Sequence, residues 1–350
     1  MKCVKERGVA HVVGLLAAEL RETIARLDFD ELLDRAHVVA LPMRVRFRGI
    51  ETREAVLIDG PAGWGEFAPF VEYSPEEAAW WLASALEAAY VGLPAPARDY
   101  VEINATVPAV PAEDVAGVLA RFPGCRTVKV KVAEPGQTFA QDVARVAAVR
   151  ALLPEAKIRI DGNRNLSVAA AQALIRAVAP LDYAEQPVAG VEELGQVRAW
   201  LGATGIAARV AADESIRRAE DPLAIAATGA VDAAVLKVAP LGGVRRLLAL
   251  AERLPFEITV ASALDTAVGM SAGLVAASHL PPVACGLGTG GLFVEDVARP
   301  RRLVGGRLST APVTPDPARV AGLAAPYARQ NWWVEHLRQS YQALRLRLQA

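Results

Sequence analysis

The fold of this chain is decided by the stretch Thr127-Val-Lys-Val-Lys-Val132 and by the shorter apolar runs that follow it. Five charged residues stand at the C-terminal ends of successive runs, and they are Lys131, Asp161, Glu185, Asp213 and Lys237. Neighbours in this series lie 24 to 30 residues apart, which is the length of one strand plus one helix. If the runs are parallel barrel strands, their C-terminal ends converge on the face where such barrels keep their active sites. We therefore expect these five side chains to share one site.

The first stretch carries two lysines on one strand face. Strand residues two apart point the same way, so Lys129 and Lys131 share a face while Val128, Val130 and Val132 share the other. In a barrel the valines would face the helices and the lysines the interior. Two ammonium groups side by side disfavour each other's charge, which lowers the pKa of both and brings a lysine closer to the range of a useful base. An edge strand with two solvated lysines is the alternative for this motif alone.

Carboxylates follow at the next three strand ends. The motifs are Ile158-Arg-Ile-Asp-Gly-Asn163, Asp182-Tyr-Ala-Glu-Gln-Pro187 and Ala211-Ala-Asp-Glu-Ser215. Each fragment alone could be a helix N-cap, since Asp and Ser are common there. Three carboxylates together repel unless a cation lies among them, and all-oxygen ligands suit Mg²⁺. The sequence thus predicts a magnesium site formed by Asp161, Glu185 and Asp213, with Lys131 on one flank and Lys237 on the other.

Composition and charge exclude several classes of protein. Apolar residues make up 53% of the 350 residues, charged residues 22%, and the formal net charge is −1. This balance leaves no electrostatic footprint for nucleic acid or an anionic membrane. The cysteines, Cys3, Cys125 and Cys285, have no C-x-x-C spacing, so neither a disulfide framework nor a zinc site is expected. The predicted ligand is a small molecule, and the oligomeric state stays open.

The first residues resemble a weak signal peptide, because Lys2, Lys5 and Arg7 precede the apolar stretch Val9–Ala18. Against secretion, His11 interrupts that stretch and no clean small-residue cleavage site follows. No apolar run reaches the roughly 20 residues that span a bilayer. We expect a cytoplasmic protein.

The chain divides into four predicted parts. Residues 1–36 have apolar residues near helical spacing and predict a helical extension without visible chemistry. Residues 37–100 predict a small α+β capping domain with strands at Val38–Phe47 and Glu54–Ile58. Ser74-Pro-Glu-Glu77 is a strong helix start, and that helix should run to about Tyr90.

Strand–helix alternation then fills residues 101–290, which predicts a parallel α/β architecture. An open doubly wound sheet also satisfies the alternation, but five strand ends converge only if the sheet closes. We expect a modified TIM-type (β/α) barrel, with strands seven and eight at Glu257–Ala261 and Val283–Cys285. The expected helices are Thr138–Leu152, Ser167–Val178, Val191–Leu201, Pro222–Thr228, Gly243–Leu254 and Thr266–His279. Residues 291–350 should pack back on the capping domain and end in an amphipathic helix, Asn331–Ala350.

One glycine-rich motif is misleading. Gly286-Leu-Gly-Thr-Gly-Gly291 matches G-x-G-x-x-G, but a dinucleotide fold needs this motif at its first strand–helix turn with an acidic residue about 20 positions later. Neither condition holds here. The turn could offer backbone N–H groups to a substrate carboxylate, or it could be plain turn geometry.

Taken together, these motifs resemble the enolase superfamily, in its muconate-lactonizing-like branch. The matching residues are Lys129-Val-Lys131, Asp161-Gly-Asn163, Glu185-Gln-Pro187, Asp213-Glu-Ser215 and Lys237, and the similarity covers roughly residues 37–310. The segments Arg44–Gly49, Gly63–Phe67, Asn104–Pro108, Ala212–Arg217 and Lys237–Gly243 are most similar to actinobacterial dehydratases of that branch. The resemblance implies a magnesium-dependent lyase of menaquinone biosynthesis. It would remove water from a succinyl-bearing hydroxycyclohexadiene carboxylate to give an aromatic acid.

The resemblance also implies a role for each residue. Asp161, Glu185 and Asp213 would bind Mg²⁺, Lys131 would remove the proton α to a carboxylate, and Lys237 would stabilise the enolate from the opposite side. The supporting residues would be Lys129, which lowers the pKa of Lys131, together with Asn163 and Glu214. Residues 37–100 would cap the barrel mouth, with Arg44–Gly49 as a lid. The implied substrate contacts are Arg46, Arg159, Ser262 and Gly288.

Rival functions share this scaffold. Two lysines facing each other suit an N-acylamino acid or dipeptide racemase, or a muconate cycloisomerase, as well as a dehydratase. The arginines of the Arg44–Arg48 segment favour a dicarboxylate substrate. A barrel that binds a ligand without catalysis is a rival of another class, and the presence of all five charged residues argues against it.

Overall fold

The computed structural model describes residues 15–47 and 49–349. The first 14 residues of the predicted helical extension, and Arg48 of the predicted lid, therefore lie outside the described residues. The rest of the extension contains two short helices, α2 (Ala18–Arg26) and α3 (Phe29–Asp34). Their buried residues Leu20, Ile24 and Leu32 join the core of the capping domain.

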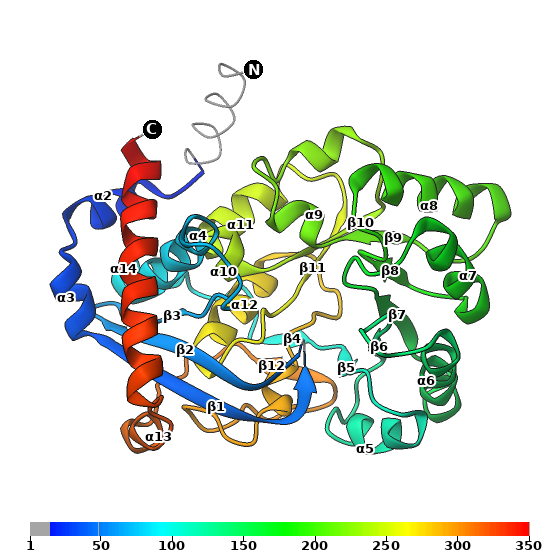
Figure 1. Cartoon of the computed structure of the whole chain (residues 1–350), viewed down its shortest axis with the longest axis horizontal. Coiled ribbons are helices and arrows are strands. Elements are labelled where there is room, and N and C mark those ends of the chain that lie inside the picture. The colour runs from blue at the N-terminus through cyan, green and yellow to red at the C-terminus, as the bar shows by residue number, and fades with distance from the viewer. Residues whose placement is uncertain (1–14, 48, 350) are drawn as a thin grey trace.

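The capping domain begins with an antiparallel sheet of three strands in the order β1-β2-β3, at the lower left of Figure 1. The strands are β1 (Ala36–Phe47), β2 (Ile50–Gly60) and β3 (Gly63–Phe67). Helix α4 (Pro75–Leu86) starts as predicted, because the Ser74 side chain accepts a hydrogen bond from the backbone N–H of Glu77. Beyond Leu86 the expected helix continues as a π-helical turn, Glu87–Val91.

The second unit is a curled parallel sheet with its helices on the outside (Figure 1). Its strands run in the order β11-β10-β9-β8-β7-β6-β5, so each strand pairs with its neighbour in sequence. The bounds are β5 (Ala105–Val107), β6 (Thr127–Lys131), β7 (Lys157–Asp161), β8 (Tyr183–Glu185), β9 (Val210–Ala212), β10 (Ala233–Leu236) and β11 (Glu257–Val260). This arrangement is the parallel α/β fold that the sequence predicts.

Three of the helices around this sheet start at capping residues visible in the sequence. Thr138 forms a capping box with Gln141, and Ser167 and Thr266 accept hydrogen bonds from the first turns of their helices. The helices are α5 (Val115–Leu119), α6 (Phe139–Leu152), α7 (Val168–Val178), α8 (Val191–Thr204), α9 (Glu214–Arg217), α10 (Val238–Leu241), α11 (Val244–Ala251) and α12 (Ala267–His279). The helix expected at Pro222–Thr228 is wrong, since only a 3-10 turn, Ala224–Ala227, forms there.

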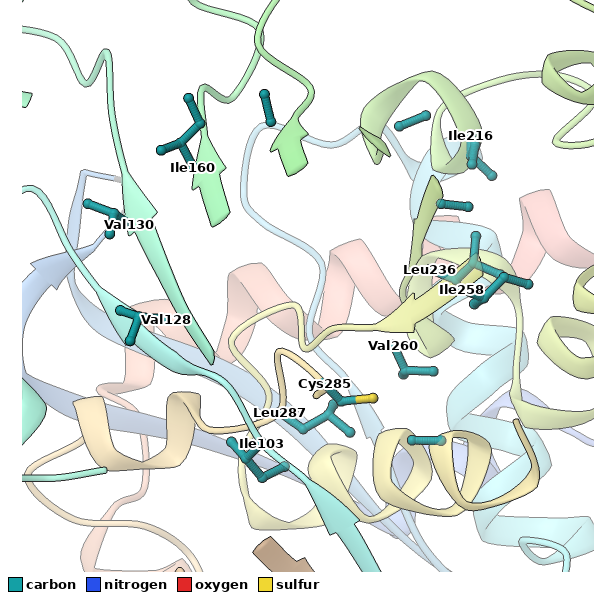
Figure 2. Packing of buried hydrophobic residues seen from close by; sticks show 14 of the residues in the cluster. Ile103, Val128, Val130, Ile160, Ile216, Leu236, Ile258, Val260, Cys285 and Leu287 are labelled. Carbon is teal, nitrogen blue, oxygen red and sulfur yellow. The ribbon is translucent and has the colours of Figure 1, made fainter. Parts of the chain in front are cut away.

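The predicted eighth strand, Val283–Cys285, is also wrong. Two isolated parallel bridges take its place, one between Ile103 and Cys285 and one between Ala261 and Gly286. Hydrogen bonds from Asn104 N to Cys285 O and from Ser262 N to Gly286 O tie this segment to both edges of the curled sheet. In Figure 2, Cys285 and Leu287 lie between Ile103 and Val260. We call this two-residue closure the seam, and it exists because Pro281, Pro282 and the glycines around it leave few residues able to extend a ladder.

The C-terminal residues return to the capping domain. After β12 (Arg307–Ser309), which pairs with β4 (Tyr100–Glu102), come α13 (Pro317–Gly322) and the long helix α14 (Tyr327–Gln349). Helix α14 crosses the capping domain in Figure 1, and its buried residues Trp333, Leu337 and Leu344 share one core with β2 and α4. Within residues 15–47 and 49–349, no helix is both long and apolar enough to span a bilayer.

Two buried glutamates fasten the capping domain to the barrel. Glu66 of β3 accepts hydrogen bonds from the backbone N–H groups of Thr266 and Gly269 at the start of α12. Glu87 accepts from the N–H groups of Val244 and Arg245 at the start of α11. Carboxylates are favourable at helix N-termini, so each glutamate holds a barrel helix in place from across the domain boundary.

Candidate active site

Strand register brings the predicted residues to one level. Lys131 lies opposite Asp161 in the β6–β7 pairing, and Asp161 lies opposite Glu185 in the β7–β8 pairing. Asp213 and Lys237 each follow directly after their strands, β9 and β10. The five side chains come from five consecutive strands of one curled sheet, and all five are at least mostly buried.

The two lysines of β6 share a carboxylate. The Nζ of Lys131 donates to Asp161 Oδ2 at 2.6 Å and to Asn163 Oδ1 at 2.9 Å. The Nζ of Lys129 donates to the same Asp161 oxygen at 2.9 Å and to Glu185 Oε1 at 3.0 Å. Val128, Val130 and Val132, which alternate with these lysines, are buried in the core formed with the outer helices. Thus Lys129 bridges two carboxylates, while Lys131 reaches the outer rim of the group.

Asp213 forms the centre of a second ionic group. Its Oδ2 accepts from Lys237 Nζ at 2.5 Å, and its Oδ1 accepts from Arg217 Nε at 2.9 Å. Arg217 also donates to Glu214 Oε1 at 2.6 Å and to the hydroxyl of Tyr73 in the capping domain. The other oxygen of Glu214 is buried and has no hydrogen-bond partner in the described part of the chain. Arg217 therefore links Asp213 to the capping domain.

The electrostatics of the two lysines differ. Burial and the ammonium group of Lys129 lower the pKa of Lys131, against the opposing pull of Asp161. Burial also disfavours charge on Lys129, but Asp161 and Glu185 outweigh it and raise its pKa well above the ordinary value. The prediction that each lysine lowers the pKa of the other is thus correct in direction for Lys131 and wrong for Lys129. The physical reason is that Lys129 contacts two carboxylates whereas Lys131 contacts one.

The three carboxylates also differ from one another. Burial and the neighbouring charges of Asp161 and Asp213 raise the pKa of Glu185 to about 7. Burial opposes ionisation of Asp161 and Asp213 too, but Lys129 and Lys131 hold the pKa of Asp161 well below its usual value, and Lys237 and Arg217 lower that of Asp213 to about 2. Glu185 is therefore the one of these three carboxylates whose neighbouring cations do not outweigh burial and repulsion.

The expected cluster of three carboxylates around one point is not formed in this arrangement. Within the described ranges, no three His, Cys, Asp or Glu side chains come together closely enough to hold a metal ion. The lysines are the physical reason, since Asp161 and Glu185 meet at Lys129 whereas Asp213 turns to Lys237 and Arg217. The donors are hard oxygens, Lys129 already places a positive charge between two of them, and at Glu185 this charge does not offset burial and the neighbouring carboxylates. This donor set fits a divalent cation such as Mg²⁺.

The charged residues border a small chamber of about 30 Å³, lined by Lys131, Asp161, Asn163, Lys237 and Ser262 among others. Outside it lies a wider mouth of about 530 Å³, whose lining includes Arg46 and Glu134. Phe47, Lys131 and Asn163 line both spaces. The Phe47 ring centroid lies 5.5 Å from Lys131 Nζ, so the end of β1 separates the chamber from the mouth.

Two predicted substrate contacts lie elsewhere. The Arg159 side chain stacks on Tyr183 and donates to Asp182 Oδ2 at 2.7 Å and to Ala284 O at 2.6 Å. These partners stand near the N-terminal ends of the strands, one layer below the chamber. Gly288 lines a separate cavity, and a Cβ there would meet Ile103 and Phe122 at 2.9 Å. Neither residue lines the chamber.

Several chamber residues were not singled out from the sequence, namely Phe47, Phe70, Thr106 and Thr289. Arg217 was also missed, although it stands four residues after Asp213 and so one helical turn away. That spacing is a signal that could have found it. Thr106 lies in β5, while the others come from a loop and from the capping domain, and no local pattern marks any of them as chamber residues.

Comparisons with known proteins agree with this fold. A family profile described as "Enolase N-terminal domain-like" matches residues 38–89, and one described as "Enolase C-terminal domain-like" matches residues 112–312. Among solved structures, muconate lactonizing enzyme from Pseudomonas fluorescens has a TM-score of 0.68 at 20% identity, covering 83% of this chain and 98% of that one. This likeness shows the fold.

Curated relatives are much closer in sequence. The chain is 59% identical over 313 residues to an o-succinylbenzoate synthase of Mycolicibacterium smegmatis, which covers 88% of this chain and 95% of the relative. It is 57% identical over 320 residues to an o-succinylbenzoate synthase of Mycobacterium tuberculosis, covering 90% and 96%. The chain belongs to the enolase superfamily and, within it, to the family of the o-succinylbenzoate synthases.

Proposed function

We propose that this chain dehydrates 2-succinyl-6-hydroxy-2,4-cyclohexadiene-1-carboxylate to 2-succinylbenzoate, the reaction of an o-succinylbenzoate synthase in menaquinone biosynthesis. Identity of 57–59% to enzymes of that name makes it an enzyme of this family. The observation that carries the proposal is Lys131, a buried lysine with a lowered pKa at the end of a barrel strand and on the wall of a chamber. Such a group is suited to removing a proton.

Lys131 is the proposed base. Its Nζ would take the proton α to the substrate carboxylate, and the C–H electron pair would move onto that carboxylate to give an enediolate. The same ammonium group would then give a proton to the β-hydroxyl, which leaves as water while the new C=C bond forms. No external oxidant or reductant is needed for this balance. Asn163, which accepts a hydrogen bond from Lys131, would hold the ammonium group in position.

Lys237 is the proposed electrostatic partner. It lines the chamber from β10, four strands away from Lys131 in the sheet order. A fixed positive charge at that place would stabilise the developing enolate more than the ground state. Arg217 and Asp213 would orient it, because Asp213 contacts both cations.

Asp161, Glu185 and Asp213 would hold Mg²⁺, with Lys129 and Glu214 as supporting charges. When bound, the ion would supply positive charge to a carboxylate that becomes doubly negative on proton loss. To bind the ion, Asp161 and Asp213 would have to turn part of their lysine contacts toward it. The ion would also add positive charge next to Glu185, whose pKa is raised without it. The role of Lys129 is then to keep the carboxylate group compact and to disfavour charge on Lys131.

The mouth is the proposed entrance for a dicarboxylate. Arg46 lines it and donates to Gly49 O at the β1–β2 turn, so its guanidinium group stands near the route to the chamber. Ser262 lines the chamber, with its Oγ 2.5 Å from Thr289 Oγ1. These two residues would contact the substrate carboxylates. Arg159 and Gly288 would support the barrel and the 286–291 turn instead.

Racemisation of an N-acylamino acid is the second candidate, because two lysines, Lys131 and Lys237, line one chamber. One lysine could remove a proton from one side of the α-carbon while the other returns it from the opposite side. Both activities would use the same residues, so they are separated by substrate and not by mutation.

A direct assay tests the proposal. Purified full-length protein with Mg²⁺ and the cyclohexadiene substrate should produce the aromatic product, measured by ultraviolet absorbance, and a chelator should abolish turnover until Mg²⁺ is restored. Parallel incubation with an N-succinylamino acid, followed by polarimetry, measures the second candidate. Absence of product with the first substrate would overturn the proposal, and an unchanged rate after chelation would remove the metal role.

A further inference from the structure

A second cavity of about 280 Å³ lies behind the turns that line the chamber. Ser262, Ala263 and Leu264 face the chamber, while Asp265, Thr266 and Ala267 face the second cavity. The 286–291 turn divides in the same way, since Gly286 and Thr289 line the chamber and Leu287, Gly288 and Gly290 line the other space. We call this space the accessory cavity, and two turns separate it from the reacting centre.

The walls of the accessory cavity are mostly apolar. Phe122, Met270, Leu287 and Leu308 are buried around it, and Leu303 covers one side. An engineered apolar cavity of about 150 Å³ is known to bind benzene, so a volume of about 280 Å³ admits one ring with a substituent. The walls therefore select a compact apolar body.

One charged side chain at this cavity has an unused donor. The Nη1 of Arg301 donates to Ser309 O at 2.9 Å and to Ala311 O at 2.7 Å. Its Nη2 donates to Ser271 Oγ at 2.8 Å. Its Nε is buried and has no partner among the described residues. A buried donor without a partner costs free energy, and such groups call for an explanation. The Nε and Nη2 edge of a guanidinium group can donate two parallel hydrogen bonds to a carboxylate.

Two acids also line the accessory cavity, and both accept backbone hydrogen bonds. Asp296 accepts from the N–H groups of Ala267 and Val297, and Asp265 accepts from Ala263 N–H. Burial raises the pKa of Asp296 to about 6, and burial together with Glu66 raises that of Asp265 to about 7. Burial therefore disfavours the charged form of both acids, more strongly for Asp265 than for Asp296. Two exposed arginines, Arg121 and Arg302, add positive charge at the rim.

From this geometry we propose that the accessory cavity is a binding site for a small monocarboxylate with one apolar ring, whose carboxylate pairs with Arg301. The ring would occupy the space between Met270, Leu287 and Leu303. The carboxylate would accept from the Nε that now has no partner. Since the same two turns line the chamber, an occupant would restrict the motion of Ser262 and Thr289. This site does not depend on the proposed function, because it is defined by binding and not by turnover.

Benzoate is the probe, and benzamide is its uncharged counterpart of similar shape. Isothermal titration of the full-length protein should show benzoate binding, with benzamide weaker by about tenfold or more. Arg301→Gln should weaken benzoate by a similar factor. The neighbouring Arg299→Gln is the matched control, because Arg299 is exposed and does not line the cavity, and it should leave the affinity unchanged.

A second variant guards against misfolding of the first. Leu303→Trp keeps Arg301 but fills the cavity with a larger side chain, so it should abolish binding while circular dichroism stays native. Lys131→Ala reports on the chamber, and it should leave benzoate binding intact. Binding that survives Arg301→Gln and Leu303→Trp but disappears in Lys131→Ala would place benzoate in the chamber and overturn the proposal. No measurable binding at millimolar benzoate would overturn it too, and would mean that water satisfies Arg301.

Discussion

The barrel contains two groups of charged residues, which we call the lower and the upper layer, and their charges are balanced differently. The lower layer consists of Arg159, Asp182, Arg209 and Glu257, near the N-terminal ends of the strands, and the upper layer consists of Lys129, Lys131, Asp161 and Glu185. In the lower layer Asp182 accepts from Arg159 Nε at 2.7 Å and from Arg209 Nη2 at 2.5 Å, and Arg209 also reaches Glu257 at 3.0 Å. In the lower layer these ion pairs join only residues of opposite charge.

The pKa values separate the two layers. Burial acts against every charge in both, yet in the lower layer Arg159 and Arg209 lower the pKa of Asp182, and Asp182 helps to raise that of Arg159. In the upper layer Lys129 and Asp161 are likewise shifted toward their charged forms, but the pKa of Lys131 is lowered and that of Glu185 is raised to about 7. A pKa shifted toward the uncharged form of a buried group marks a residue that can exchange a proton or receive a cation. Burial of charge alone therefore does not identify a site, whereas charges left unbalanced do.

The largest expected effect lies in the upper layer. Lys131→Ala should lower kcat by about 10²- to 10⁴-fold, the usual contribution of a general base. Its thermal midpoint should change little, because Asp161 keeps its contact with Lys129. Steady-state kinetics and circular dichroism measure the two effects. Lys157→Ala is the matched control on the neighbouring strand, since Lys157 is exposed. Turnover within tenfold of the wild type would remove Lys131 as the base.

The lower layer should respond in the opposite sense. Arg159→Leu leaves Asp182 with one cation in place of two, and breaking a buried ion pair costs about 3 kcal/mol of unfolding free energy. The folded fraction should keep a near-normal kcat. Urea denaturation gives the first quantity and kinetics at low temperature the second. A variant of normal stability that had lost activity would move Arg159 into the site and erase the contrast between the layers.

A smaller effect is expected from a buried arginine of the capping domain. Arg53 donates to the carbonyl oxygens of Ala263 and Leu264, two residues of the chamber wall. Arg53→Met should lower kcat by about tenfold through misplacement of that wall, with KM less affected. Arg53→Lys should restore part of the rate. If the two substitutions lowered stability equally and left kcat of the folded protein intact, Arg53 would only support the fold.

The smallest effect is a pH dependence of stability. The folded pKa of Asp182 is lowered, so its ion pairs contribute stability above the ordinary Asp pKa, and this contribution disappears as pH falls through the folded value. Asp182→Asn should therefore be less stable than the wild type at pH 7, with a difference that shrinks below about pH 4. Urea midpoints at pH 7 and pH 3 measure this change. A constant difference would show that Asp182 acts through packing and not through charge.

Much of the fold was predictable because local signals agreed with the global pattern. The caps at Ser74, Thr138 and Ser167 start helices where expected, and the alternation of Lys129 and Lys131 with valines places the lysines inside. The level of Asp161 and Glu185 follows from strand ends in register. These features depend on neighbours along the chain or in the adjacent strand.

The failures depend on distant partners. The seam looks like a strand in the sequence, because Val283–Cys285 is apolar, yet within that run only Cys285 makes a bridge. The pKa of Lys129 depends on Glu185 in β8, two strands away from its own strand. Arg159 has the same local pattern as a chamber residue, and only the position of Asp182 and Ala284 shows that it lies in the lower layer. Arg159 and Lys129 are paired in register, so sequence spacing gives the face and the level of a residue and not the layer that its side chain joins.

The seam also has a consequence for the order in which this protein assembles. Strands β5 to β11 pair with their neighbours in sequence, so each pairing closes only a short loop. Joining Ile103 to Cys285 is different, since nearly the whole barrel separates them along the chain. Contacts between such distant residues form slowly. The parallel sheet would thus stay open during synthesis until the residues beyond Gly286 have left the ribosome. Pairing of Cys285 and Gly286 with the two edges of the sheet would then be the last step of folding.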